Sequence, residues 1–166
     1  QAVRLDPGFG LAYTGLADTF SATGNSRSGE EAKAAYIKAK FYAEKSLELD
    51  PDSAEGHTSR GRLKRIHDWD WDGAEKDFER AIVLNPNYAT AHFFYAQLLS
   101  FLGRHDEAIA EIDRAAEIDP ISQTITGARF AILESCGKYD EALKLAEESI
   151  KFDPESRNFR RALGTV

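Results

Sequence analysis

Histidine and cysteine are the side chains in this sequence that could bind a transition metal. The single cysteine, Cys136, allows neither an internal disulfide nor a cysteine-based zinc site. No two histidines lie four residues apart, the spacing that places two ligands on one helical face; they are His57, His67, His92 and His105. A glycine-rich phosphate loop and a nucleophile motif are also missing. We therefore expect no metal, no cofactor and no catalytic site.

The balance of charge argues against two classes of partner. The 166 residues include 28 acidic and 21 basic side chains, for a formal net charge of −7. Nucleic acids and anionic membrane surfaces bind clustered Lys and Arg, so we expect neither as a partner of this segment. No apolar run is long enough to cross a bilayer. The chain lacks methionine and a signal-peptide pattern, so we expect a segment of a longer protein, with the cytoplasm as its compartment.

Proline spacing indicates a repeated unit. The prolines, at intervals of 44, 35, 34 and 34 residues, are Pro7, Pro51, Pro86, Pro120 and Pro154. Proline cannot continue a helix and pushes the preceding residue out of the helical region, so each one predicts a helix end. Before each proline, small and large apolar residues recur at spacings of four, three and one, which predicts one buried helical face. After each proline a second helix is predicted, and Gly103 and Gly137 predict the turn between the two helices of a unit.

Two segments show the unit most clearly: GRHDEAIAEIDRAAEIDP (103–120) and GKYDEALKLAEESIKFDP (137–154). The unit is a 34-residue pair of helices with columns of small residues, an intervening glycine and a closing Asp-Pro. It resembles the tetratricopeptide repeat. The resemblance implies an all-α fold, a right-handed α-solenoid of stacked antiparallel helix pairs, each burying its apolar face against the next. We divide the chain into the tail of a preceding repeat, a repeat with an insertion, three further repeats, and the start of another repeat or a capping helix. These segments are 1–7, 8–51, 52–86, 87–120, 121–154 and 155–166.

Two repeats depart from this pattern. The first carries ten additional residues, in which Ser28 and Glu31 predict a capping box and a second helix about two turns longer. The second replaces the glycine turn with HDWDWDG (67–73). Its tryptophans, Trp69 and Trp71, are expected to staple the helix pair; the alternative is an exposed contact site.

Arg60 occupies a position that Leu16 and Tyr95 occupy in neighbouring repeats. Either its stem lies along the core while its charged head reaches out, or the packing there differs from that of the family. Three aspartates stand where an N-cap would open the second helix of a repeat: Asp72, Asp106 and Asp140.

In such a solenoid the first helices of successive pairs line a concave groove. Steps of three and four residues along each first helix select a mostly polar face, which we take as the candidate site for an extended peptide. The candidates are Thr14, Asp18, Glu55, Thr58, Arg62, Arg65, Thr90, Phe93, Gln97 and Glu134. Thr14 and Asp18 stand where tetratricopeptide proteins that bind chaperone tails use Lys and Asn. An aspartate would repel the carboxylate of such a tail, so that activity is not expected.

The middle of this face is its most distinctive part. Phe93 and its neighbour Phe94 are predicted to lie beside Arg62 and Arg65 of the preceding repeat. An aromatic surface next to two cations suits an acidic or aromatic peptide. The alternative is that the rings pack against adjacent helices while the arginines are solvated.

These patterns predict a non-catalytic interaction scaffold, with a peptide, a protein or another domain of the same chain as its partner. The run DWDWDGAEKDFERAI, with the insertion before it, resembles the C-terminal repeat arrays of bacterial multidomain regulators linked to winged-helix, kinase or cyclase modules. That resemblance implies a role in regulation or signalling. The alternative is an assembly module that self-associates through the ends of the array into a homo-oligomer. Phe159 and Leu163 are expected to cover the C-terminal end.

Overall fold

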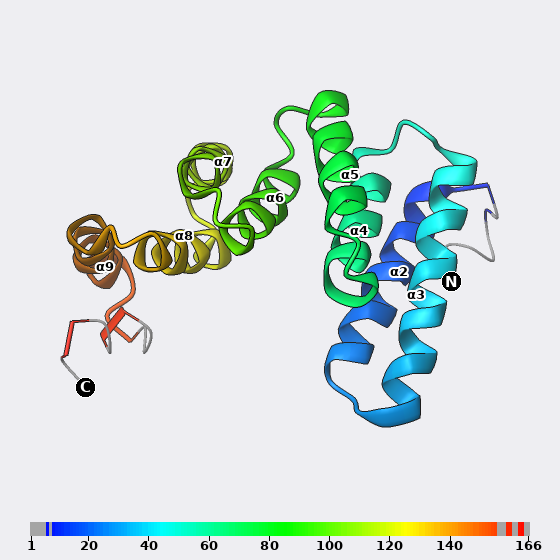
Figure 1. The fold of residues 1–166 in the computed structure, drawn as a ribbon, viewed down its shortest axis with the longest axis horizontal. Helices are drawn as coiled ribbons and strands as arrows, with labels where there is room; N and C mark the ends of the chain where they lie inside the picture. Colours follow the sequence, from blue (N-terminus) through cyan, green and yellow to red (C-terminus); the bar gives the residue numbers. More distant parts are fainter. Residues whose placement is uncertain (1–5, 7, 156–158, 161–162, 165–166) are drawn as a thin grey trace. The chain divides into compact units, whose positions relative to one another are not determined.

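The computed structural model describes residues 6, 8–155, 159, 160, 163 and 164, and every regular element within them is helical (Figure 1). The α-helices are α2 (Gly10–Asn25), α3 (Gly29–Leu49), α4 (Ala54–Leu63), α5 (Trp71–Leu84), α6 (Ala89–Phe101), α7 (His105–Ile118), α8 (Gln123–Ser135) and α9 (Tyr139–Phe152). A π-helix, η1 (Lys64–Asp68), directly follows α4. The all-α expectation is confirmed for the described residues. The predicted tail of a preceding repeat lies outside them, apart from Asp6.

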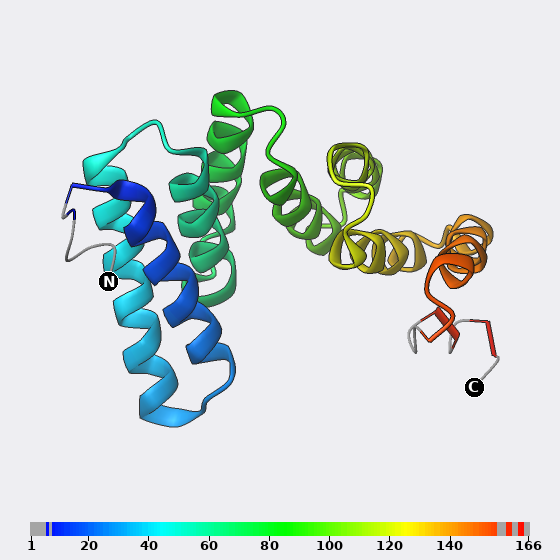
Figure 2. The same ribbon diagram turned by 180° about the vertical axis from the view of Figure 1, so that it is seen from behind.

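Residues 1–95 and 96–166 form two compact units, and the boundary falls within α6. In the first unit, α2 packs along α3, α4 packs along α5, and both α2 and α3 contact α4. Figure 2 shows the same helix pairs from behind. In the second unit, α7 and α9 each pack against α8. Within each unit, packing between consecutive antiparallel helices therefore holds the fold together, as the repeat predicts.

The prolines mark helix ends as the sequence predicts. Each second helix ends two residues before a proline, at Leu49, Leu84, Ile118 or Phe152. The residue that precedes the proline has left the helical region in every case, with φ between −130° and −141°. Proline Cδ clashes with a helical conformation of the residue before it, which gives the physical cause.

Small residues occupy the buried columns. The alanines twelve residues before each proline have almost no exposed surface; they are Ala39, Ala74, Ala108 and Ala142. Large side chains fill the gaps that these alanines leave, and Phe78 and Ile112 are fully buried. Because full burial of such a side chain contributes about 1.5–3 kcal/mol, these columns are a main source of stability.

The insertion lengthens the first helix pair. Helix α3 has 21 residues, whereas α5, α7 and α9 have 14 each. The difference of about two turns confirms the predicted extension. Ser28 precedes α3 as its N-cap, but its hydroxyl makes no capping hydrogen bond, and Glu31 pairs with Arg27 instead. The capping-box prediction was therefore wrong in its hydrogen bonds and right in its position.

The N-cap prediction was also wrong, by two residues in each of the three helices. Helix α5 is capped by Asp70, whose Oδ1 accepts a hydrogen bond from the Gly73 N–H at 3.0 Å. Asp72 lies inside the first turn of that helix. Asp106 and Asp140 lie in the first turns of α7 and α9. There their carboxylates interact favourably with the helix dipole without capping it.

The turn between α4 and α5 holds a residue other than glycine in a left-handed conformation. Trp69 lies 17 residues before its proline, the same position as Gly103 and Gly137 before theirs. Its φ is 55°, against 77° and 73° for the two glycines. The π-helix η1 ends immediately before it and absorbs the one additional residue of the 35-residue interval between Pro51 and Pro86.

The same turn corrects the staple prediction. Trp69 is 68% exposed, so it does not hold the helix pair together. Trp71 is half-buried as the first residue of α5, and the two indole rings lie 6.3 Å apart. Phe159 behaves as expected at the C-terminal end, since it is buried and packs edge-on against Phe130 at 5.7 Å.

Candidate interaction face

Arg62 joins three successive first helices in the unit formed by residues 1–95. Its guanidinium donates a hydrogen bond from α4 to Asp18 Oδ1 on α2, at 2.7 Å. The Ser59 hydroxyl, one helical turn earlier, donates to the same oxygen at 2.8 Å. On its other side the guanidinium lies 5.3 Å from the centre of the Phe94 ring on α6. We call the surface around Asp18, Arg62 and Phe94 the first-helix face.

The chemistry of arginine explains this arrangement. A guanidinium donates hydrogen bonds in its own plane and stacks on an aromatic ring through its flat face, so one side chain can serve both neighbours. Arg62 Nε is nevertheless buried without a hydrogen-bond partner among the described residues. Because that atom is itself buried, it leaves the side chain incompletely satisfied and offers no contact to a ligand in this conformation.

Both phenylalanines of the predicted face are present, but the ring that contacts Arg62 belongs to Phe94 rather than to Phe93. Phe93 and Phe94 are both half-buried, and their ring centres lie 4.7 Å apart. Phe94, which was named only as a neighbour, is the ring that contacts Arg62. The alternative of a fully solvated Arg62 is wrong, because that side chain is paired and mostly covered.

The electrostatic setting of the face mixes both charges. Burial lowers the pKa of Arg65, and the positive charge of Arg62 lowers it further, so the two cations are close neighbours. Burial raises the pKa of Tyr88; the Thr90 hydrogen bond opposes this, and the charges of Glu55 and Asp18 add to it. The predicted members Asp18, Glu55, Arg62, Arg65 and Thr90 thus belong to one unit of the molecule. Their role in binding stays a prediction.

Two of the predicted members do not lie on the face. Thr14 and Thr58 are buried, so a ligand cannot reach them. The Thr14 hydroxyl lies 2.7 Å from the Ser46 hydroxyl on α3, and Thr58 donates to the Ala54 carbonyl at 2.8 Å. A threonine can satisfy its hydroxyl within the helix or against a neighbour, so its polarity alone is weak evidence of exposure.

The remaining predicted members fall in the unit formed by residues 96–166. Gln97 on α6 is half-buried and Glu134 on α8 is exposed. Ser100 and Ser135 lie near them in the sequence, and their hydroxyl oxygens are 3.1 Å apart, which places α6 and α8 side by side in this unit. A contribution of Gln97 and Glu134 to binding stays a prediction.

Sequence reasoning missed a buried ionic cluster around Asp77. This carboxylate on α5 is only 3% exposed and lies 2.9 Å from Arg60 Nε and 2.8 Å from Lys64 Nζ. His57 Nδ1 is 3.1 Å away. Burial alone would raise the pKa of Asp77, but hydrogen bonds from His57, Arg60 and Lys64 overcome it and hold the pKa far below its usual range.

The cluster settles the two alternatives for Arg60. Its charged head turns toward α5 and Asp77, so the packing of this pair differs from a purely apolar one. The signal was present in the sequence, because basic side chains at 57, 60 and 64 share one face of α4 and of the start of η1. His57 and His92 each lie six residues after a proline, and their Nε2 atoms lie 3.0 and 3.1 Å from the carbonyl oxygens of Pro51 and Pro86.

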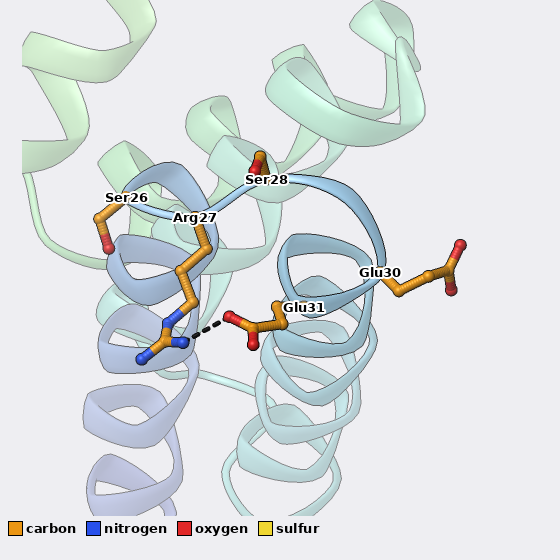
Figure 3. Close-up of a pocket in the computed structure, with 5 residues that line it drawn as sticks. All are labelled: Ser26, Arg27, Ser28, Glu30 and Glu31. Carbon is orange, nitrogen blue, oxygen red and sulfur yellow. Dashed lines mark hydrogen bonds and ion pairs between the residues drawn. The ribbon is translucent and has the colours of Figure 1, made fainter.

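A polar hollow of about 630 Å³ lies at the turn between α2 and α3, and Figure 3 shows the residues that line it. Its five lining residues are exposed; they are Ser26, Arg27, Ser28, Glu30 and Glu31. Arg27 and Glu31 pair with each other, while Glu30 points away from the hollow. This arrangement leaves no unpaired convergent group among these five, so we assign no site there. The described residues contain no group of three potential metal ligands, and none of their helices is long and apolar enough to cross a membrane.

Comparison with known proteins identifies the fold. Residues 70–121 match the family model of the tetratricopeptide repeat. The crystal structure of TTC0263, a thermophilic TPR protein in Thermus thermophilus, is similar with a TM-score of 0.79 over 99% of this chain and 84% of that chain, at 19% identity. A comparison with curated protein sequences finds no match.

Two other solved structures are similar over most of their lengths. MamA is 24% identical, with a TM-score of 0.66 over 90% of this chain and 75% of that chain. The pilF protein of Pseudomonas aeruginosa is 17% identical, with a TM-score of 0.70 over 91% of this chain and 67% of that chain. At these identities the likeness shows the fold, an all-α solenoid of tetratricopeptide repeats.

Proposed function

We propose that this chain is a non-catalytic protein-interaction scaffold that binds a peptide, a protein or a neighbouring domain on its first-helix face. The fold supports the class, because tetratricopeptide repeats generally bind proteins or peptides. The observation that supports the location is Arg62, which is held between Asp18 on α2 and the Phe94 ring on α6. Such a preorganised cation on an aromatic ring resembles the hot spots of protein interfaces.

The proposed ligand is an extended acidic or aromatic segment. The neighbouring cation Arg65 supports an acidic ligand, since a carboxylate would relieve the repulsion between the two guanidinium groups. Within a larger protein the array would act as the docking arm of a bacterial regulator, a role that rests on the sequence resemblance alone. Assembly through the ends of the array is the second proposal, and burial of Phe159 against Phe130 counts against the C-terminal end as its site.

The test begins with a random dodecapeptide display library selected on the purified chain. The affinity of the selected peptide is then measured by calorimetry for the wild type, Arg62→Ala and Phe94→Ala. We expect each variant to weaken binding by about tenfold or more, a loss of about 1.4 kcal/mol. Ile121→Ala is the matched control, because Ile121 is an almost fully exposed apolar residue far along the chain. Unchanged binding by both face variants would contradict the proposed location.

A further inference from the structure

The lengthened helix α3 and the π-helix η1 are the two departures from the repeat pattern, and both line one cavity in the unit formed by residues 1–95. The N-terminal half of α3 belongs to the lengthened first pair, and η1 holds the additional residue of the second pair. A cavity of about 490 Å³ lies between them, a volume in the usual range of ligand pockets. Its lining includes Lys33, Tyr36, Ile37 and Lys40 of α3, and His67 and Asp68 of η1.

The interior of this cavity combines an apolar wall with one unsatisfied polar atom. Leu63 is buried at its base, and the Tyr36 ring lies against the His67 ring. His67 Nε2 is buried and has no hydrogen-bond partner among the described residues. Burial lowers the pKa of His67, the charge of Asp68 opposes this, and the charge of Arg62 adds to it. A buried polar atom without a partner costs free energy, so this part of the wall is not fully satisfied within the fold.

The cavity lining carries two lysines and one aspartate, in an otherwise acidic protein. Residues 32–43, AKAAYIKAKFYA, contain three lysines and no acidic residue, although the chain has a net charge of −7. Lys33, Ile37 and Lys40 are spaced by four and three residues, which places them on one face of α3. Among the described residues Lys33 meets only Glu30, at 3.9 Å between highly exposed side chains, so it is open to a further anion. Lys40 pairs with Asp68 at 2.7 Å across the cavity rim.

Large apolar side chains near these charged residues face solvent. Ile37 is 65% exposed and Phe41, one turn further along α3, is 60% exposed. Trp69, which follows Asp68 in the chain, is held outward by its left-handed backbone. Phe41 and Trp69 do not line the cavity, so exposed apolar side chains are present beyond it, as at protein contacts.

We propose that this α3–η1 surface is a second docking site, separate from the first-helix face, for an acidic segment of a partner protein that carries a large apolar side chain. The apolar side chain enters the cavity against Leu63 and Ile37. Carboxylates on either side of it face Lys33 and Lys40. Charge complementarity favours this occupant over a basic segment, and like charges at such a contact would be strongly unfavourable.

The test uses a fluorescein-labelled, end-blocked octapeptide, Glu-Asp-Glu-Leu-Phe-Asp-Glu-Asp, and its fluorescence anisotropy with the folded chain. We expect saturable binding that weakens at about 0.5 M NaCl, because exposed charges are screened there. Replacing Leu-Phe by Ser-Ser, or all acidic residues by Lys, should abolish binding. The double variant Lys33→Glu with Ile37→Ser should weaken binding by about tenfold or more.

The matched control is Lys76→Glu with Val83→Ser on α5, which removes an exposed lysine and an exposed apolar residue elsewhere in the same unit. An equal loss in this control, or no binding at about 1 mM chain, would overturn the proposal. Phe94→Ala removes a ring of the first-helix face and changes no charge. It should leave the affinity for this peptide unchanged, so failure here is distinct from failure of the first-helix face. A chain that dimerises in sedimentation, and loses the dimer in the Lys33→Glu, Ile37→Ser variant, would identify a second copy as the occupant and contradict the partner proposed.

Discussion

Trp69 and Gly103 occupy the same position in successive repeats, and both have a left-handed backbone, with φ of 55° and 77°. A residue with a Cβ costs about 1–2 kcal/mol in this conformation, whereas glycine adopts it freely. The indole ring recovers little of that cost through packing, because it is mostly exposed. The second repeat thus keeps the backbone turn of its neighbours while placing an aromatic ring in solvent, at the edge of the proposed docking surface.

Replacement of this tryptophan by glycine should stabilise the fold. We expect Trp69→Gly to raise the free energy of unfolding by about 0.5–1 kcal/mol, since relief of the backbone strain exceeds the entropy lost by a more flexible unfolded chain. Urea unfolding monitored by circular dichroism measures the change. Trp69→Ala is the control, because it removes the ring and retains the strain; an equal gain in both variants would show that backbone conformation is not the cause.

The buried carboxylate of Asp77 should be important for stability. Asp77→Asn removes the negative charge that compensates Arg60 and Lys64, so we expect the free energy of unfolding to fall by about 3 kcal/mol. Asp113→Asn is the matched control, because Asp113 forms a half-exposed ion pair with Arg129 and its loss should change stability by less than about 1 kcal/mol. Equal losses of unfolding free energy in the two variants would mean that burial of the Asp77 ion pairs does not increase their contribution to stability.

The same cluster predicts a pH dependence. Burial raises the pKa of Asp77, but its three hydrogen bonds lower it far below the value of about 3.9 for an unfolded aspartate. Because the folded pKa is the lower one, the contribution to stability is complete above about pH 4 and decreases as the pH falls below it. We expect wild-type unfolding free energy to decrease in this acid range more steeply than that of Asp77→Asn. Parallel curves for the two proteins would contradict the assignment.

Much of the fold was predictable because it depends on spacing. Each proline predicts the end of a helix. Columns of alanine, such as Ala74 and Ala108, indicate where two helices pack closely. The face was less predictable, because Thr14 and Thr58 are polar yet satisfy their hydroxyls inside the fold. The basic side chains of the Asp77 cluster share one helical face and were visible in the sequence, but their carboxylate partner lies on a different helix, and the tertiary structure was needed to pair them.

The last prediction concerns two glycines of α2 that look equivalent in the sequence. A Cβ at Gly24 would lie 2.7 Å from Cζ of Tyr36, and closer still to Cε1, whereas a Cβ at Gly15 would meet no atom within 4 Å. The Tyr36 ring cannot move aside freely, because its hydroxyl donates to Asn25 Oδ1 at 2.9 Å and the ring contacts His67. We therefore expect Gly24→Ala to lower the free energy of unfolding by about 1–3 kcal/mol through overpacking. Gly15→Ala should raise it by about 0.5–1 kcal/mol, since alanine favours an exposed helical position over glycine. Thermal unfolding of the two variants checks this, and a stabilising Gly24→Ala would show that Tyr36, and with it the cavity wall, is free to rearrange.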